Sequence, residues 1–434
     1  MIVHPPESDL VLPKHPTGIA GFDFIAQGGL PKGRTTLVAG TAGSAKTVFA
    51  AQFLAEGIRQ HGEAGVFVTF EEAALDIRRN MRSLHWPIEQ WEAEGRWAFV
   101  DASPVPADDG PVIGEFDLGG LLARIENAVR RTGARRVSMD SVATIFARFD
   151  DHATVRSELL RITQALKTMG VTSIITAERT QEYGDIARFG VEEFVTDNVI
   201  ILRNVLEVER RRRTIEILKF RGAPHGKGEY PFTIIPGDGL VVIPLSAIEL
   251  QQHSSDIRIT SGNTELDRMC GGGFFRDSVI LVSGATGTGK TLMTAEFLNG
   301  GVQNGERCLV FAFEESREQL IRNARGWNVD FERAEQTGLL RLSCEYPEVM
   351  GLEDHLIRLK AEIEAFRPQR IAVDSLSALE RVSSQRGFRE FVIGLTSFIK
   401  HRQVAGLFTS TTPTLLGGDS VTEAHISSIT DSII

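Results

Sequence analysis

The chain of 434 residues contains the same long sequence pattern twice. A stretch that begins at Thr17 and ends in AGTAGSAKT returns at Thr260, where it ends in SGATGTGKT. Lys46 matches Lys290, and later segments match as well, among them VFVTFEE with LVFAFEE. The period is far longer than the roughly 20–50 residues of a solenoid repeat. The repeat therefore predicts two related domains.

Each copy alternates short apolar runs with amphipathic segments. The runs TTLVAG and VILVSG suit buried parallel strands, whereas TVFAAQFLAEGIRQ and TLMTAEFLNGGVQ suit helices. Strands that alternate with helices predict an α/β fold with a mainly parallel central sheet flanked by helices. We place the first domain at residues 1–247 and the second at 248–434, with a polar linker over residues 236–259. The strand-like sequence that ends the first copy has no counterpart before Ile434, so we expect the second domain to be truncated at its C-terminus.

A glycine-rich loop stands between a predicted strand and a predicted helix in each copy. The second loop fits G-x-x-x-x-G-K-[ST] at every position, and the backbone N–H groups of such a loop wrap nucleotide phosphates. The first loop has Ala45 in place of the last glycine, and we expect this alanine to start the helix in a right-handed conformation without strain. The predicted nucleotide-binding residues are Gly40, Thr41, Ala42, Gly43, Ser44, Ala45, Lys46 and Thr47 in the first copy, and Gly284, Thr286, Gly287, Thr288, Gly289, Lys290, Thr291 and Leu292 in the second.

Acidic residues follow other apolar runs. Asp140 and Asp374 each end a run, where a carboxylate beside the loop can hold Mg²⁺ through water; a helix cap is the alternative. One member of Glu71–Glu72 and one of Glu314–Glu315 could activate water or a hydroxyl group. The alternative is a solvated helix start, which the helix dipole favours. The predicted Mg²⁺ contacts are Thr47, Thr291 and Glu314.

These motifs, together with LRNVLEVERRRRTIEILKFRG, FAFEESREQLIRNARGW and EAHISSITDSI, resemble the KaiC family of clock ATPases and autokinases. The resemblance covers almost the whole chain and implies two tandem RecA-like P-loop NTPase domains with ATP and Mg²⁺ as cofactors. It implies ATP hydrolysis in the first domain, with Glu71 and Glu72 catalytic. It implies serine autophosphorylation in the second domain, with Glu314 as base and Glu315 as its partner. A cytoplasmic homohexamer with ATP between subunits and a KaiB-like partner is also implied.

The resemblance assigns further residues by position. Ser83 and Trp327 would lie near the nucleotide, although a core position is the alternative for Trp327. Ser427 and Ser428 would accept phosphate, and a polar loop is the alternative. The matching cations of the second domain and the KaiA-binding segment of the family lie past Ile434, so KaiA is expected as a partner only if the chain continues. The cations that would reach the ATP of the adjacent subunit are Lys219, Arg221 and His225.

Composition narrows the alternatives. Lys and Arg total 47 against 57 Asp and Glu, and this acidic balance counts against a nonspecific nucleic-acid binder. A RecA-like nucleic-acid-dependent ATPase is therefore the second hypothesis, and a nucleotide-gated scaffold without kinase activity is the third. Neither a secretory signal nor an apolar run of about 18 residues is present. The widely spaced Cys270, Cys308 and Cys344 indicate free thiols in a reducing compartment.

Overall fold

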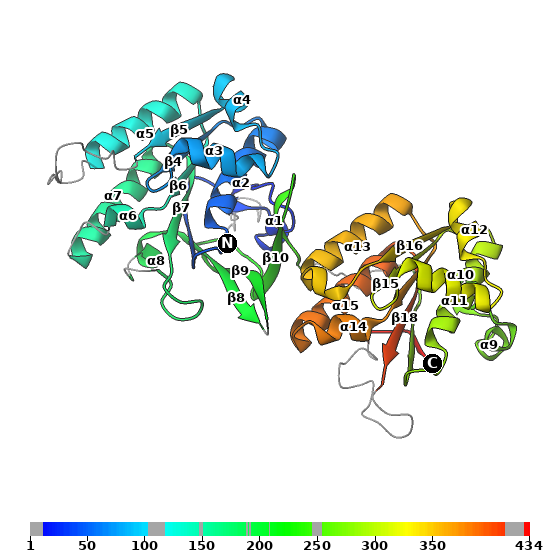
Figure 1. Cartoon of the computed structure of the whole chain (residues 1–434). Helices are drawn as coiled ribbons and strands as arrows, with labels where there is room; N and C mark the ends of the chain where they lie inside the picture. Colours follow the sequence, from blue (N-terminus) through cyan, green and yellow to red (C-terminus); the bar gives the residue numbers. More distant parts are fainter. Residues whose placement is uncertain are drawn as a thin grey trace, which may run out of the picture. The chain divides into compact units, whose positions relative to one another are not determined.

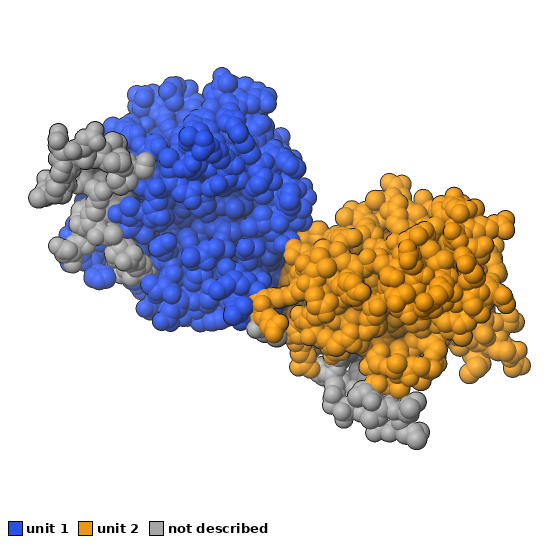
Figure 2. Space-filling model, in the orientation of Figure 1, with its two compact units in different colours: residues 1–206, 211–244 blue, residues 207–210, 245–434 orange. Residues whose placement is uncertain are grey.

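The computed structural model describes residues 12–102, 118–146, 151–187, 190, 192–207, 209–244, 254–412 and 429–434. The chain divides into two compact units (Figure 2). The first unit comprises residues 1–206 and 211–244, and the second comprises residues 207–210 and 245–434. Each unit contains a sheet with helices beside it, as Figure 1 shows.

The first unit is built on a nine-stranded sheet with the order β11-β10-β9-β8-β3-β7-β6-β4-β5. Strands β5, β4, β6, β7, β3 and β8 pair in parallel, whereas β10 pairs antiparallel with β9 and β11. The strands are β3 (Thr35–Gly40), β4 (Gly65–Thr69), β5 (Trp97–Asp101), β6 (Arg136–Asp140), β7 (Thr172–Glu178), β8 (Asn198–Glu207), β9 (Arg210–Phe220), β10 (Glu229–Ile235) and β11 (Gly239–Val242), with a separate ribbon of β1 (Lys14–His15) and β2 (Leu30–Pro31).

Helices cover both faces of this sheet. One apolar core packs α2 against the sheet, and the other packs α5 and α7 against it. The helices are α1 (Phe22–Ile25), α2 (Lys46–His61), α3 (Ala74–Arg82), α4 (Ile88–Ala93), α5 (Leu118–Thr132), α6 (Ala143–Phe146), α7 (His152–Thr168) and α8 (Glu192–Val195). Strand β11 lies inside the segment that we expected to be a linker, because Leu240 and Val242 alternate into the core and are buried.

The second unit repeats the parallel part of this plan. Its sheet has the order β16-β15-β17-β18-β14-β19, and all neighbouring strands are parallel. The strands are β14 (Val279–Gly284), β15 (Cys308–Ala312), β16 (Leu340–Cys344), β17 (Arg370–Asp374), β18 (Ala405–Thr411) and β19 (Ser432–Ile433), with a ribbon of β12 (Arg258–Ile259) and β13 (Phe274–Phe275). The helices are α9 (Thr264–Met269), α10 (Lys290–Gln303), α11 (Arg317–Gly326), α12 (Phe331–Gln336), α13 (Leu352–Phe366), α14 (Leu376–Arg381) and α15 (Gln385–His401).

The fold class expected from the repeat is confirmed in both units. The runs TTLVAG and VILVSG form β3 and β14, and the helices expected after them are α2 and α10. The three cysteines are free, and no described helix is both long and apolar enough to cross a membrane.

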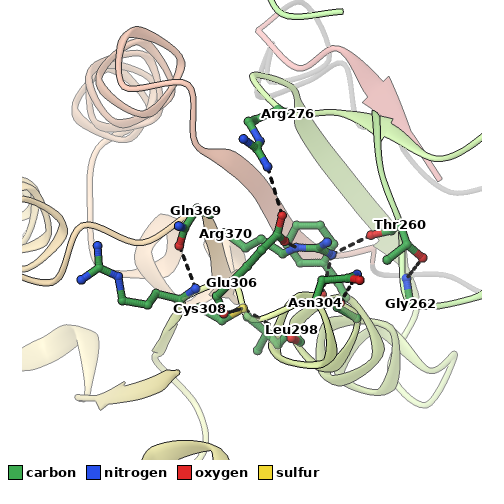
Figure 3. A network of polar contacts seen from close by, with 12 residues as sticks. Thr260, Gly262, Arg276, Leu298, Asn304, Glu306, Cys308, Gln369 and Arg370 are labelled. Carbon is green, nitrogen blue, oxygen red and sulfur yellow. Dashed lines mark hydrogen bonds and ion pairs between the residues drawn. The ribbon is translucent and has the colours of Figure 1, made fainter. Parts of the chain in front are cut away.

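A buried arginine connects the helix after each glycine-rich loop to the sheet. Arg136, at the start of β6, is fully buried and donates to the Phe53 carbonyl in α2 at 2.9 Å and to Glu63 at 2.9 Å. In the second unit, Arg370 donates to the Phe297 carbonyl and to Glu306 in the same way. Arg276 also donates to Glu306 (Figure 3). The strands that these arginines start end at Asp140 and Asp374, the aspartates predicted beside the loops. The arginine contacts therefore set how each loop helix lies relative to the strand that carries the aspartate.

Candidate nucleotide-binding and catalytic sites

The two glycine-rich loops lie at the carboxyl ends of β3 and β14, directly before α2 and α10. In the first loop, Lys46 Nζ donates to the carbonyls of Gly40 and Thr41, each at 2.9 Å. In the second loop, Lys290 Nζ donates to the carbonyls of Gly284 and Ala285 at 2.8 and 2.9 Å. Burial lowers the pKa of Lys46, and surrounding carboxylates oppose that shift. Both ammonium groups therefore lie inside their loops, where phosphate oxygens can replace the carbonyls as acceptors.

The expectation for Ala45 is wrong. The residue has φ 72° and ψ 27°, in the left-handed region, and Gly289 at the matching position has φ 95°. Both residues are helix N-caps, and the loop approaches its helix through a left-handed turn rather than through a first helical residue. An L-residue pays about 1–2 kcal/mol in this region, so the first loop carries strain that the second avoids with glycine.

The aspartates predicted beside the loops lie on the neighbouring strands. Asp140 ends β6 and accepts a hydrogen bond from the Thr176 hydroxyl on β7; Asp374 ends β17 and accepts one from Thr409 on β18 at 2.5 Å. Burial raises the pKa of Asp140, whereas hydrogen bonds from Thr176 and Thr47 lower it. The contact with Thr47 brings this carboxylate to the loop hydroxyl that was predicted to meet Mg²⁺. The threonine partners were missed, although both copies carry them at matching places.

The glutamate pairs follow β4 and β15, at the same sheet edge as the aspartates. The second glutamate of each pair contacts an asparagine on the next helix. Asn80 donates to Glu72 at 3.3 Å, and Asn323 donates to Glu315 at 3.3 and 3.4 Å. Burial and the neighbouring aspartate raise the pKa of both Glu72 and Glu315. Neither asparagine was predicted from the sequence, and the signal that could have found them is their matching position in the two copies.

The first glutamate of each pair has different partners in the two units. Glu71 accepts a hydrogen bond from the Thr144 hydroxyl. Glu314 accepts from Ser375 at 2.8 Å and from Arg381 at 2.6 Å. Burial alone would raise the pKa of Glu314, but the hydrogen bonds from Arg381 and Ser375 outweigh it and lower the pKa below its ordinary value. The candidate base is therefore held by a cation in the second unit and by a neutral hydroxyl group in the first.

Three predicted binding residues of the first unit lie away from its own phosphate loop. Lys219 donates to the carbonyls of Glu193 and Thr196 at 2.9 and 3.0 Å. Arg221 Nη1 lies 4.0 Å from Asp197, which directly precedes β8, whereas the phosphate loop follows the other end of the parallel strand β3. His225 follows the end of β9 at Phe220, and the centroids of the two rings are 5.4 Å apart. A contact between these cations and the nucleotide of their own unit would have to span the length of the sheet.

The remaining predicted residues have simpler surroundings. Ser83 is exposed at the end of α3, and its hydroxyl donates to the Asn80 carbonyl at 2.8 Å. Trp327 is half-buried at the end of α11 and packs against the apolar core of the second unit. This placement matches the core alternative for Trp327 in part. Ser427 and Ser428 lie outside the described residues.

Comparison with known proteins identifies the family. A family model described as the KaiC ATPase matches residues 15–247 and again residues 259–434. The circadian clock protein KaiC3 of Synechocystis sp. is 68% identical over 418 residues, which cover 96% of this chain and 83% of the relative. The circadian clock oscillator protein KaiC of Thermostichus vulcanus is 55% identical over 428 residues, 99% of this chain and 82% of the relative. The duplicated loops and acids agree with the double match, and the chain belongs to the KaiC family of ATPases and autokinases of circadian timing.

Proposed function

We propose that the first unit hydrolyses ATP and that the second unit transfers phosphate from ATP to Ser427 and Ser428. The observation that carries the proposal is a constellation present in both units. In each unit, a loop lysine, a strand-end aspartate and a pair of glutamates meet at the carboxyl ends of the parallel strands. These strand ends are where nucleotides bind in open α/β sheets.

The chain's own residues suit a nucleotide held with Mg²⁺. Lys46 and Lys290 would exchange their carbonyl partners for phosphate oxygens. The hydroxyl groups of Thr47 and Thr291 would hold Mg²⁺, which usually takes one or two protein groups besides phosphates and water. Asp140, bonded to Thr47, would bind the waters of that ion. When bound, Mg²⁺ neutralises charge on the transferred phosphoryl group.

The glutamate pairs would act on the nucleophile. In the first unit, Glu71 and Glu72 would orient and deprotonate the attacking water. In the second unit, Glu314 would accept the proton of a serine hydroxyl, and it would also approach Mg²⁺. Arg381 keeps Glu314 ionised, which suits a base that works beside a cation. Glu315 would support it through its bond with Asn323.

The first-unit cations support an oligomer with shared sites. Lys219, Arg221 and His225 lie at the end of the sheet opposite their own phosphate loop, so they would serve the ATP of a neighbouring copy. Cations supplied in this way stabilise the charge that develops on the phosphoryl group. We propose a cytoplasmic homohexamer with ATP between its subunits and a KaiB-like protein as its partner.

Separate inactivation of the two loops tests this division of labour. Lys46→Ala should abolish most steady-state ATP hydrolysis while leaving the second loop intact, and Lys290→Ala should abolish labelling of serine. The assay incubates each full-length variant with γ-labelled ATP and Mg²⁺, then maps the labelled peptides and measures released phosphate. Ser427→Ala combined with Ser428→Ala should remove the label without reducing hydrolysis by the first unit.

The same assay separates the alternatives. Hydrolysis without phosphoserine, together with nucleotide-dependent binding of a KaiB-like protein, would favour the nucleotide-gated scaffold. Salt-sensitive DNA binding with DNA-stimulated hydrolysis would favour a nucleic-acid-dependent ATPase. Label that persists on serine in Lys290→Ala would contradict the assignment of the kinase site to the second unit.

A further inference from the structure

The outer side of the first phosphate loop is joined to the segment that follows β7. Thr41, the second residue of the loop, donates from Oγ1 to Glu182 Oε1 at 2.6 Å. The other carboxylate oxygen of Glu182 accepts from the main-chain N–H of Asn204 in β8 at 3.0 Å. One carboxylate therefore connects the phosphate loop to two other parts of the unit.

Buried arginines hold the segment that carries Glu182. Arg203 Nε donates to the Glu182 carbonyl at 3.2 Å, and Arg179 donates to the carbonyls of Asp185 and Gly184 at 3.0 and 3.2 Å. Arg179 and Arg203 are only 6% and 7% exposed, so the donor side of these contacts is buried. The main chain at Glu182 and just after it is thus held by these arginines, and Glu182 is a fixed point against which the phosphate loop rests.

A second contact supports the same loop from β9. Arg213 Nε donates to the Gly43 carbonyl at 3.3 Å. The loop needs such support because the left-handed Ala45 raises the energy of its conformation by about 1–2 kcal/mol relative to a loop with glycine there. Hydrogen bonds from outside the loop offset this strain and disfavour competing loop conformations.

The second unit does not repeat the contact. Ala285 stands where the first loop has Thr41, and alanine has no hydroxyl group to donate. Gly289 also replaces the strained alanine. The strained loop and its support therefore occur together in the first unit, which links the contact to the first nucleotide site in particular.

We infer that Glu182 is a positioning residue of the first nucleotide site, which holds the phosphate loop through Thr41 in the conformation that binds ATP. This inference rests on the proposed binding of ATP by that loop. The negative charge of Glu182 by itself would repel phosphates, but the buried Arg179 interacts favourably with this carboxylate and offsets part of its charge. Preorganisation of the loop then outweighs repulsion, and loss of the contact weakens ATP binding.

The test measures the dissociation constant of ATP in the full-length chain with Lys290→Ala, so that binding reports the first loop. Glu182→Ala and Thr41→Val each remove the contact and should weaken binding about 10- to 150-fold, the range that corresponds to a hydrogen bond to a charged group. Thr41→Ser keeps the hydroxyl and should stay within about 2-fold of the parent. The double variant should bind ATP about as weakly as whichever single variant binds it less tightly, because both changes remove the same contact between Thr41 and Glu182.

The matched control is Glu126→Ala, which removes an exposed carboxylate of α5 that pairs with Arg130 and should leave ATP binding unchanged. Unchanged or tighter binding by Glu182→Ala and Thr41→Val would overturn the inference, and so would effects that multiply in the double variant. Thr41→Val tests the contact independently if Glu182→Ala fails to fold. A parent chain that does not bind ATP would refute the proposed function of the loop, a result distinct from binding that ignores Glu182.

Discussion

Glu63→Gln tests the ion pair between the buried Arg136 and the half-buried Glu63, which connects the first phosphate-loop helix to the sheet. Arg136 is fully buried and pairs with Glu63 at 2.9 Å, while its other N–H groups reach carbonyls. Loss of one charge from a buried pair costs about 3–5 kcal/mol, because the remaining charge lacks a partner. Glutamine keeps an oxygen acceptor that recovers about 1 kcal/mol. We therefore expect the free energy of unfolding of the first unit to fall by about 2–4 kcal/mol.

Tryptophan fluorescence can follow the first unit alone. Three of the four tryptophans, Trp86, Trp91 and Trp97, lie in that unit, and Trp97 is buried against Trp91. A Trp327→Phe background makes the signal specific to the first unit. Without nucleotide, we expect Glu63→Gln to lower the midpoint of thermal unfolding by about 5–15 °C, since about 1 kcal/mol shifts a domain of this size by about 2–4 °C.

The control is Glu126→Gln, which makes the same chemical change in an exposed pair with Arg130. Exposed helical pairs contribute about 0.5 kcal/mol or less, so this variant should barely move the midpoint. If Glu63→Gln and Glu126→Gln shift the midpoint equally, the claim that the buried Arg136 depends on the counter-charge of Glu63 is refuted.

Three further changes have defined outcomes. Gly289→Ala adds a methyl group that meets nothing within 4 Å, but the residue has φ 95°. Backbone strain should destabilise the second unit, and the lower entropy of the unfolded chain should offset part of that strain, which leaves a net loss of about 0.5–1 kcal/mol. Faster hydrogen exchange in α10 would show this loss. Burial lowers the pKa of His15, so protonation favours unfolding, and the free energy of unfolding of the first unit should fall as pH drops below about 6.5. His15→Gln should flatten this dependence on pH in unfolding followed by fluorescence. An unchanged dependence would contradict the role given to His15. Arg381→Ala releases one oxygen of Glu314 and should slow serine labelling about 10-fold with little change in the KM for ATP, whereas Arg386→Ala, which breaks an exposed pair on α15, should not.

Much of the fold and of the site could be predicted because the signals are local. Apolar runs and loop glycines specify β3, β14 and the phosphate loops, and the duplication showed which acids to compare. Partners on other elements were not predictable in this way. Arg136 and Glu182 look like ordinary charged residues in the sequence, and only folding brings each to the loop or helix that it holds.

Ala45 shows where local inference fails. Its type permits a right-handed helix start, but the loop must turn through a left-handed conformation to join β3 to α2, and the alanine follows the loop. The sequence by itself determined the two related domains, their nucleotide loops and their family, because these depend on residue type and spacing. The tertiary structure decided the partners of Glu71 and Glu314, the remote position of Lys219 and the support of the first loop, because each depends on which side chains the packed sheet brings together.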